Sequence, residues 1–454
     1  MNQFAKVMAE PLARDQLLDA AIRIGDQLVR TAYWSDDELA CNWLGRRDIE
    51  DREIAGYSRR TAALSPELYS GSAGTALYLD ALYAETGDAR YERTAVAAWL
   101  RSVNYMRRNH FPASPISFYA GCLGLLYAGV QILSHTQQFR TIVMDEFLFL
   151  TNRIMGGLSV HHSLDVIGGN AGAIPALVHL ADVLKQRAFL GLASDCAQEI
   201  VDKAQWKDDE ICLWAPEKVH GVELELPPLS GFSHGASGLA LGLLRAYRAT
   251  GNETFLKHAR GAFSFEDALF NPDEGNWIDT RYEHSKRDGK IVGTFRGAWC
   301  HGAPGIGLAH LYARELDPER AAYHERMARI AMKTTQAFIV QRRATQGSDI
   351  TLCHGVLGLS DILLDLATAF DDDEARSCVN ATVRSVLGEH GHPEQMPSGL
   401  QRGGYSPCLM VGIAGIGLHL LRLRNPGIPS VLCLNQPLRM VPAKPEESMD
   451  TLIR

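Results

Sequence analysis

Two cysteine–histidine pairs stand directly before glycine at comparable places in this sequence of 454 residues, Cys300–His301 and Cys353–His354. Thiolates and imidazoles are the ligands that zinc prefers in proteins, and three protein ligands with an open fourth position form a known catalytic arrangement. The alternative is that these cysteines are small buried residues packed in turns. The pattern favours a zinc ion held by Cys300, Cys353 and His354.

His301 is the ambiguous member of the two pairs, because it occupies the position equivalent to His354. It could be a fourth ligand, a hydrogen-bond donor to a ligand, or a contact for the substrate. We expect it not to bind the metal, since Cys300, Cys353 and His354 already leave the one open position that thiol activation requires.

Three more polar residues lie near equivalent points of the sequence repeat described next. His234 also precedes a glycine and is suited to general acid or base work, although a lone histidine is often structural. Asp165 could orient or charge such a histidine, or it could only cap its own turn. Arg296, four residues before Cys300, could stabilise developing negative charge or pair with an acid on an outer helix. We take His234, Asp165, Arg296 and His301 as candidate catalytic residues.

A repeated element must position all of these side chains. Gly-x-x-Gly followed by an apolar stretch occurs seven times, and the first glycines are Gly71, Gly121, Gly169, Gly235, Gly302, Gly355 and Gly412. The intervals run from 48 to 67 residues, which is enough for two helices with their connections. The stretches after the glycines are apolar nearly all round, and the segments between them are charged and amphipathic. The repeat therefore predicts seven helical hairpins, each with a buried inner helix and an outer helix.

The terminal repeats are as apolar as the middle ones, whereas an open solenoid needs polar caps at its ends. We therefore predict an all-α fold, an α/α toroid or double-layer barrel, with the Gly-x-x-Gly turns at one end around a central cavity. One domain is expected over residues 1–454, with repeats from about 68 to 423 and short terminal extensions. The two longest intervals predict extra loops at residues 206–229 and 271–294.

Composition excludes several classes of protein. The net charge of −8 leaves no obvious basic face for nucleic acid, so no nucleic-acid partner is expected. No apolar run is long enough to span a bilayer and the first residues are charged, which predicts a cytoplasmic protein without a membrane span. Nine cysteines without a Cys-x-x-Cys pair do not suit a disulfide framework.

The repeat, together with the runs Arg296–Gly305 and Leu352–Gly355, resembles the lanthionine synthetase C-like cyclases over residues 68 to 423. The resemblance implies a toroid whose zinc is held by Cys300, Cys353 and His354, with His234, Asp165 and Arg296 matching the family's cavity residues. It also implies the activity: Michael-type addition of a peptide cysteine thiol to dehydroalanine or dehydrobutyrine, which closes a thioether ring.

Two departures accompany the resemblance. His301 stands where single-protein cyclases of this family often have tyrosine, and the tail Pro429–Cys433 looks like the cyclase domain of bifunctional lanthipeptide synthetases. No stretch is long enough for a dehydratase, so the expected partners are a dehydrated precursor peptide, a separate dehydratase and a transporter. Alternatively, the chain is an excised domain.

Three other functions remain open at this point. One is a family member that binds or adds glutathione or other thiols without cyclising lanthipeptides. Another is a different zinc-thiol transferase on an α/α barrel, such as a prenyltransferase β-subunit. A glycosidase on a helical toroid is the third, but it would need two carboxylates at the rim, where the sequence places chiefly Asp165.

Overall fold

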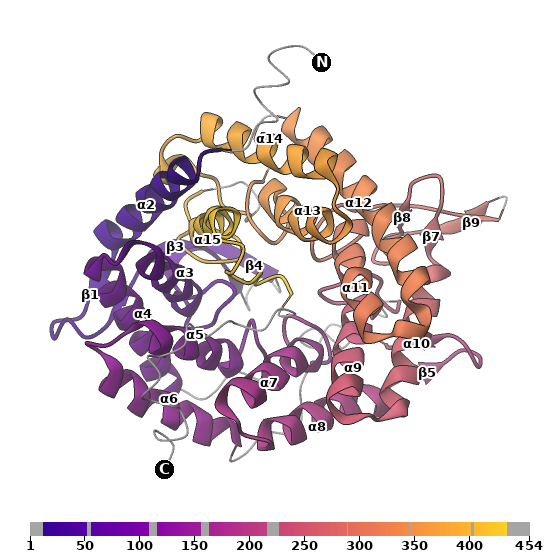
Figure 1. Cartoon of the computed structure of the whole chain (residues 1–454), viewed down its shortest axis with the longest axis horizontal. Helices are drawn as coiled ribbons and strands as arrows, with labels where there is room; N and C mark the ends of the chain where they lie inside the picture. The colour runs from indigo at the N-terminus through magenta and orange to yellow at the C-terminus, as the bar shows by residue number, and fades with distance from the viewer. Residues whose placement is uncertain are drawn as a thin grey trace.

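Two concentric rings of helices make up the structure (Figure 1). It is a computed structural model, and it describes residues 12–433 except 52–55, 109–115, 156–162, 216–226, 288, 346, 348 and 401–403. The predicted α/α toroid is confirmed, with helices alternating between the inner and outer ring along most of the chain.

Each inner helix begins at the residue after the first glycine of a Gly-x-x-Gly element, and that glycine is its N-cap. The inner helices are α3 (Ser72–Thr86), α5 (Cys122–His135), α7 (Asn170–Leu184), α9 (Ala236–Thr250), α11 (Ala303–Leu316), α13 (Val356–Phe370) and α15 (Ile413–Arg424). Their residues are buried on nearly every side, as their uniformly apolar sequences predict.

The second glycine of each element allows a close approach that any side chain would block. A Cβ atom built on Gly74 would lie 2.1 Å from the carbonyl oxygen of Leu68, and one on Gly358 would lie 1.8 Å from that of Leu352. The same contact, six residues back in the chain, recurs at Gly124, Gly172, Gly238, Gly305 and Gly415. The repeat therefore records a packing requirement: the chain before each turn lies against the first turn of the inner helix.

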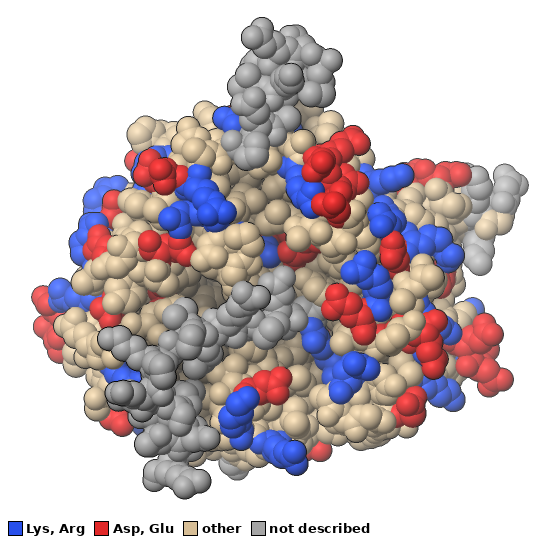
Figure 2. Space-filling model, in the orientation of Figure 1, with Lys and Arg blue, Asp and Glu red and all other residues tan. Residues whose placement is uncertain are grey.

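The outer ring is amphipathic. Its helices are α4 (Ala89–Arg108), α6 (Arg140–Met155), α8 (Ala188–Asp202), α10 (Glu253–Asp267), α12 (Ala321–Arg343) and α14 (Asp373–Glu389), together with α2 (Arg14–Thr31). Figure 2 shows one end of the toroid, where basic and acidic side chains are interspersed over the surface. No helix in the described ranges is both long enough and apolar enough to cross a membrane.

The ring is closed by a helix from the beginning of the chain. α2 packs against α15 and thereby supplies the outer partner of the last inner helix, while α15 also contacts α3. In the closure, the Tyr78 hydroxyl donates to the carbonyl oxygen of Ala21 at 2.6 Å. The short N-terminal extension expected from the sequence thus contains an outer helix. In the seventh hairpin the inner helix is α15, near the end of the described chain, and its outer helix is α2, near the beginning.

Short antiparallel hairpins decorate the connections. They are β1 (Tyr33–Trp34) with β2 (Cys41–Asn42), β3 (Leu44–Asp51) with β4 (Gly56–Ala63), β5 (Gln205–Trp206) with β6 (Cys212–Leu213), β7 (Phe270–Asn271) with β8 (Asn276–Trp277), and β9 (Ser285–Arg287) with β10 (Lys290–Val292). The predicted loop at 271–294 contains most of the last two hairpins, and much of the loop at 206–229 lies outside the described residues. Two 3₁₀ helices, η1 (Pro318–Arg320) and η2 (Pro393–Gln395), complete the elements.

Candidate metal centre

The turns before the inner helices lie side by side around one rim. Backbone hydrogen bonds join neighbouring turns, and the bond from Met410 N to Tyr69 O at 2.9 Å joins the last turn to the first. Further bonds between turns include Tyr69 N to Tyr119 O at 3.0 Å, Val166 N to Ser233 O at 2.9 Å, Ser233 N to Cys300 O at 3.2 Å and Cys353 N to Met410 O at 2.9 Å. The residues preceding the glycines are therefore neighbours in space, as the repeat predicts.

Cys300 and Cys353 meet at this rim. The Cys353 thiol donates a hydrogen bond to Cys300, and this bond is the main reason that the pKa of Cys300 falls to about 6. Burial opposes the fall, whereas the positive potential of His354, His234 and Arg281 adds to it. The same bond raises the pKa of the buried Cys353 thiol. The pair thus resembles one thiolate beside one thiol.

Tyr69 contributes a second hydrogen bond to the pair. Its hydroxyl donates to Cys353 Sγ at 2.8 Å. Tyr69 stands two residues before Gly71, so it occupies in the first repeat the place that Cys300 and Cys353 occupy in theirs.

His354 is oriented by a carboxylate. Its Nδ1 lies 2.7 Å from Asp349 Oδ2, while Asp349 Oδ1 accepts from the backbone N–H and the hydroxyl of Thr351, at 2.8 Å each. Burial is the largest single influence and works against protonation of His354, but the hydrogen bond and charge of Asp349, together with the charge of Cys300, outweigh it and the pKa of His354 is raised. A carboxylate on one ring nitrogen leaves the other nitrogen to act as a ligand, a common arrangement for metal-binding histidines.

The donor set suits zinc chemically, but it is not assembled as a group of three. In the part of the chain that the structure describes, no three His, Cys, Asp or Glu side chains form a group that could hold a metal ion as they stand. Two adjacent sulfurs and a carboxylate-held imidazole are nevertheless the ligand types of catalytic zinc. Zinc binding by Cys300, Cys353 and His354 stays a prediction.

Arg342 of the outer helix α12 ties the two ligand-bearing turns together. Its guanidinium donates to the carbonyl oxygen of His354 and, at 2.7 Å, to that of Gly297. These carbonyls belong to the turns that carry Cys353 and Cys300, so one cation links both.

His234 and Asp165 form a contact between the third and fourth turns. His234 Nδ1 lies 2.6 Å from Asp165 Oδ2, and the imidazole is 39% exposed, so it can reach a ligand. Burial opposes protonation, yet the hydrogen bond and charge of Asp165 prevail and raise the pKa of His234. Asp165 Oδ1 also accepts from the backbone N–H of Gly168 at 2.6 Å. Asp165 therefore makes both of the contacts considered for it, one with His234 and one that caps its own turn.

His301 lies beneath His234. The two rings are nearly parallel, with centroids 6.0 Å apart, and His301 is buried. Burial and the charge of Arg281 lower the pKa of His301 to about 4, although Asp279 acts in the opposite direction. Its Nδ1 atom is buried and has no hydrogen-bond partner among the described residues. A neutral, buried His301 ring thus stacks against the ring of His234.

Arg296 contacts Tyr282, which lies between β8 and β9. Its guanidinium donates to the Tyr282 hydroxyl at 2.7 Å and lies over that ring, and its Nε is 3.9 Å from Asp279 Oδ2. Asp279 is buried and forms a two-point ion pair with Arg281. The acid near Arg296 therefore belongs to the segment after β8 and not to an outer helix.

The predicted residues are brought together at one rim, and the structure adds others that the sequence pattern did not single out. These are Asp349, Arg342, Asp279, Arg281 and Tyr282. For Tyr69 a signal existed, since it lies in the row of residues before the glycines. The others act from connections and an outer helix, where no repeat marks them.

Comparisons with known proteins indicate a family for this chain. Residues 62–434 match the sequence model of the family described as "Lanthionine synthetase C-like protein". Among curated proteins, the lacticin 481/lactococcin biosynthesis protein LcnDR2 of Lactococcus lactis subsp. lactis is 22% identical over 432 residues, or 93% of this chain. The chain spans 42% of the length of that relative.

Among solved structures, nisin cyclase is similar with a TM-score of 0.57 and 18% identity. The similarity covers 80% of this chain and 89% of that one. At this identity the likeness is one of fold.

Proposed function

Since the chain belongs to the lanthionine synthetase C-like family of lanthipeptide cyclases, we propose that it catalyses zinc-dependent addition of peptide cysteine thiols to dehydroalanine or dehydrobutyrine. The products are lanthionine and methyllanthionine thioether rings. The observation that carries the proposal is the contact of Cys300 with Cys353, on adjacent turns of the rim, beside an imidazole held by Asp349.

Cys300, Cys353 and His354 are the residues that would hold the zinc, and the ion would supply Lewis acidity that lowers the pKa of a substrate thiol. Arg342 and Tyr69 support these residues from two sides through their hydrogen bonds.

His234 is the group that we assign to proton transfer. The addition forms one S–C bond at the β-carbon and one C–H bond at the α-carbon, so the thiol proton must leave sulfur and a proton must arrive at carbon. An imidazole with a raised pKa can accept the first proton and donate the second, and Asp165 fixes its ring for both steps. To Arg296, which is partly exposed, we assign the stabilisation of negative charge on the enolate oxygen.

The proposed substrate is a peptide that already contains dehydroamino acids. The reaction conserves mass and creates no double bond, so a dehydratase must act first. That enzyme is either a separate partner or another part of a longer protein. The relative LcnDR2 is a longer protein, since this chain spans 42% of its length.

The test uses a peptide with one cysteine and one dehydroalanine. We expect loss of alkylatable thiol at constant mass near neutral pH, and none above background with Cys300→Ala. Glutathione in the same mixture separates the alternative: a glutathione adduct of higher mass would indicate intermolecular thiol addition. No reaction by a zinc-loaded protein with either thiol would refute the proposal.

A further inference from the structure

The chain that follows α15 turns back into the middle of the toroid (Figure 1). We call its last described part, Ile428–Cys433, the C-terminal strap. The strap begins at the carbonyl oxygen of Ile428, which accepts from Arg422 Nε at 3.1 Å. Ser430, Val431, Leu432 and Cys433 are all buried. A buried segment without helix or strand needs partners for its backbone groups, and here they come from α15, from two turns of the rim and from Ser430 of the strap itself.

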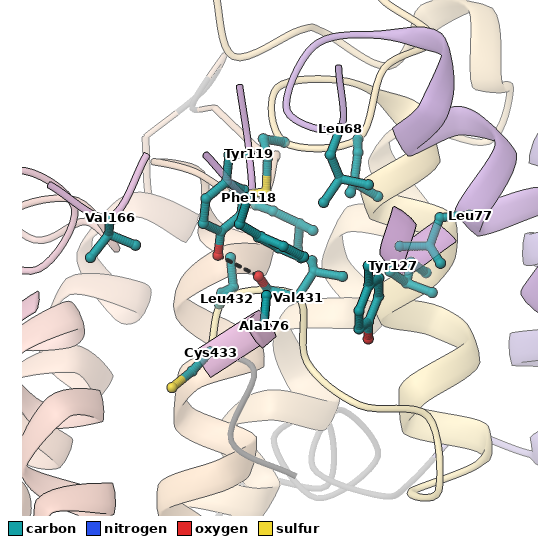
Figure 3. Close-up of a cluster of buried hydrophobic side chains, with 14 of the residues drawn as sticks. Leu68, Leu77, Phe118, Tyr119, Tyr127, Val166, Ala176, Val431, Leu432 and Cys433 are labelled. Atoms are coloured by element: carbon teal, nitrogen blue, oxygen red, sulfur yellow. Dashed lines mark hydrogen bonds between the residues drawn. The ribbon is translucent and has the colours of Figure 1, made fainter. Parts of the chain in front are cut away.

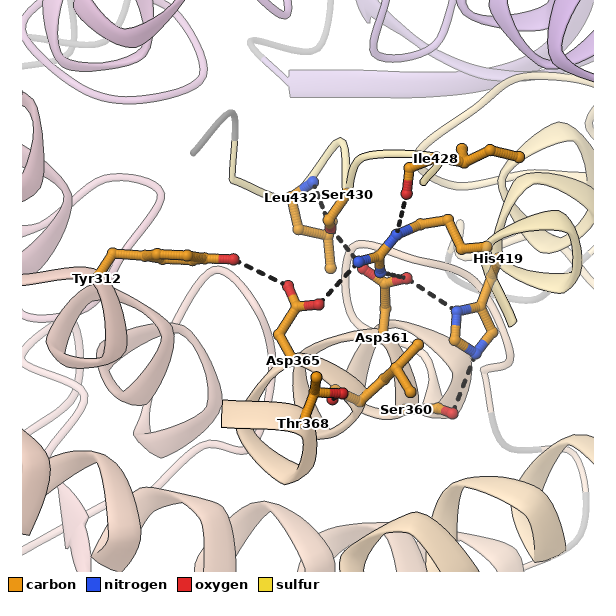
Figure 4. A network of polar contacts seen from close by, with 11 residues as sticks. Tyr312, Ser360, Asp361, Asp365, Thr368, His419, Ile428, Ser430 and Leu432 are labelled. Atoms are coloured by element: carbon orange, nitrogen blue, oxygen red, sulfur yellow. Dashed lines mark hydrogen bonds and ion pairs between the residues drawn. The ribbon is translucent and has the colours of Figure 1, made fainter. Parts of the chain in front are cut away.

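One end of the strap is fixed by a buried polar network (Figure 4). Asp361 of α13 accepts hydrogen bonds from the Ser430 hydroxyl and from Arg422 of α15. Asp365 also binds Arg422, at 2.7 Å, and the Tyr312 hydroxyl of α11 donates to Asp365 at 3.1 Å. Burial is the largest single influence and raises the pKa of Asp361, but the charge of Arg422 and the hydrogen bonds from His419 and Ser430 together outweigh it, so the pKa is lowered. The strap is thus bound to the walls of the inner ring by charged hydrogen bonds.

The other end of the strap meets the residue next to Cys300. The Leu432 carbonyl oxygen accepts from Trp299 Nε1 at 3.0 Å, and the Val431 carbonyl oxygen accepts from the Tyr119 hydroxyl at 2.6 Å. Figure 3 shows Tyr119 and Val431 in this contact, with Leu432 beside them. The Trp299 ring packs between the rings of Tyr119 and Phe232, with centroids at 5.4 and 5.8 Å.

Both the backbone and the side chain of Trp299 are therefore held in place. Its carbonyl oxygen lies against Gly305, where an added Cβ would be 2.0 Å away. Its indole N–H is fixed by Leu432. The next residue is Cys300, whose own carbonyl oxygen accepts from Phe232 N and Ser233 N.

We propose that Trp299 is a positioning residue, and that the C-terminal strap, through the Leu432 carbonyl, sets the placement of Cys300 opposite Cys353. The role as zinc ligand rests on the function proposed above; the placement of the sulfur does not. Among the described contacts, the bond to Leu432 is the one hydrogen bond of the Trp299 indole. Loss of the indole N–H therefore removes the side-chain anchor of the turn that carries Cys300.

The test replaces Trp299 by phenylalanine, which keeps an aromatic ring and removes the N–H donor. Trp99→Phe is the matched control, because Trp99 is equally buried and donates to a backbone carbonyl, that of Leu125 at 2.8 Å, on α5. Both variants lose one buried hydrogen bond, and we expect similar losses of thermal stability. Only Trp299→Phe should act on the site.

Two readouts besides activity report on the site. Zinc affinity, measured by competition with a chromophoric chelator, should fall by roughly 10- to 100-fold in Trp299→Phe, the range for groups that orient metal ligands, and stay unchanged in Trp99→Phe. In zinc-free protein, diamide takes up two hydrogens as two thiols form one disulfide. The rate at which the Cys300–Cys353 disulfide forms, followed by peptide mapping, should fall in Trp299→Phe and stay unchanged in Trp99→Phe.

Ser430→Ala and Tyr119→Phe loosen the strap while leaving Trp299 itself and the aromatic ring at position 119 in place, and both should shift the two readouts in the same direction by less. They carry the test if Trp299→Phe does not fold. Disulfide rates equal to wild type in all three variants would overturn the inference. A wild-type protein that binds no zinc would refute the proposed function, while the disulfide comparison would still decide the positioning role.

Discussion

His234 offers an exposed imidazole whose ring is fixed by Asp165, and this combination defines a prediction. His234→Ala should keep the fold and the zinc, because no cysteine or ligand-bearing turn loses a hydrogen bond. The cyclisation rate should fall by roughly 10²- to 10⁴-fold, the usual contribution of a positioned acid or base. Rates near neutral pH and metal content are to be measured together. A wild-type rate would show that the histidine is structural.

Asp165→Asn refines this test. The amide oxygen can still accept from Gly168 N, so the turn stays capped, whereas the negative charge beside His234 is lost. We expect a lower rate at unchanged thermal stability. A variant that loses stability but keeps its rate would indicate that capping is the main role of Asp165.

His301 and Cys300 are neighbours in sequence with different expected roles. Cys300→Ala should lose zinc and ring closure together, whereas His301→Ala should keep its zinc. Metal analysis of both purified variants distinguishes them, with Cys196→Ala, a buried cysteine of α8, as the control for loss of a thiol. Complete loss of zinc from His301→Ala would make His301 a ligand.

The sequence could identify residues of the site that share a repeat position, since a fixed place before glycine becomes a fixed place on the rim. It brought Cys300, Cys353 and His234 together although the chain separates them widely. The repeat in the sequence did not identify Asp349 and Arg342. Their partners are backbone carbonyls, a hydroxyl and a ring nitrogen, which no spacing in the sequence marks.

At the scale of the helix, the second glycine of each turn predicts a large difference between two glycine substitutions. Gly124→Ala places a Cβ 2.1 Å from the carbonyl oxygen of Phe118, and we expect a loss of about 1–3 kcal/mol in the free energy of unfolding. Gly388→Ala, inside α14 and open to space, should gain about 0.5–1 kcal/mol. Denaturant unfolding measures both. Equal effects would mean that the turns yield to a side chain.

A buried histidine pair between α11 and α12 predicts acid sensitivity. His310 Nδ1 and His324 Nδ1 lie 2.9 Å apart. Burial lowers the pKa of His324 to about 4 and that of His310 well below its usual value. Because histidines in an unfolded chain titrate near about 6.5, the unfolded state binds more protons below that pH. The free energy of unfolding should therefore fall as pH drops from about 6.5 to 4, by up to ~1.4 kcal/mol per pH unit for each histidine.

His324→Gln removes one of these groups and keeps a polar partner for His310. Its unfolding free energy should depend less steeply on pH over that window, whereas the exposed His392→Gln should leave the slope unchanged. Unfolding midpoints across a pH series provide the measurement. A slope equal to that of wild type would contradict the explanation.

At the scale of the whole molecule, the closure of the ring depends on α2. Ile24 is fully buried in that helix, and Ile24→Ala should cost roughly 2–5 kcal/mol, as in a protein core. Ile142→Ala, at a residue 36% exposed on α6, should cost about 0.5 kcal/mol or less. Calorimetry of both variants tests whether the first described helix belongs to the cooperative unit. The sequence did not predict this helix as part of the ring, because the Gly-x-x-Gly signal marks inner helices alone.

The C-terminal strap also decides how a chain can move relative to this molecule. Leu432 and Trp299 have no exposed surface and Tyr119 almost none, so these described residues fill the middle of the ring at this level, with only a small pocket beside Tyr119 and Leu432. In the part of the chain that the structure describes, the toroid is therefore closed at the level of the strap. A peptide undergoing the proposed reaction must enter and leave by the same mouth, as a loop, and its two ends never pass through the enzyme. Substrates with a folded domain at each end, or with joined ends, should therefore be cyclised as readily as linear ones.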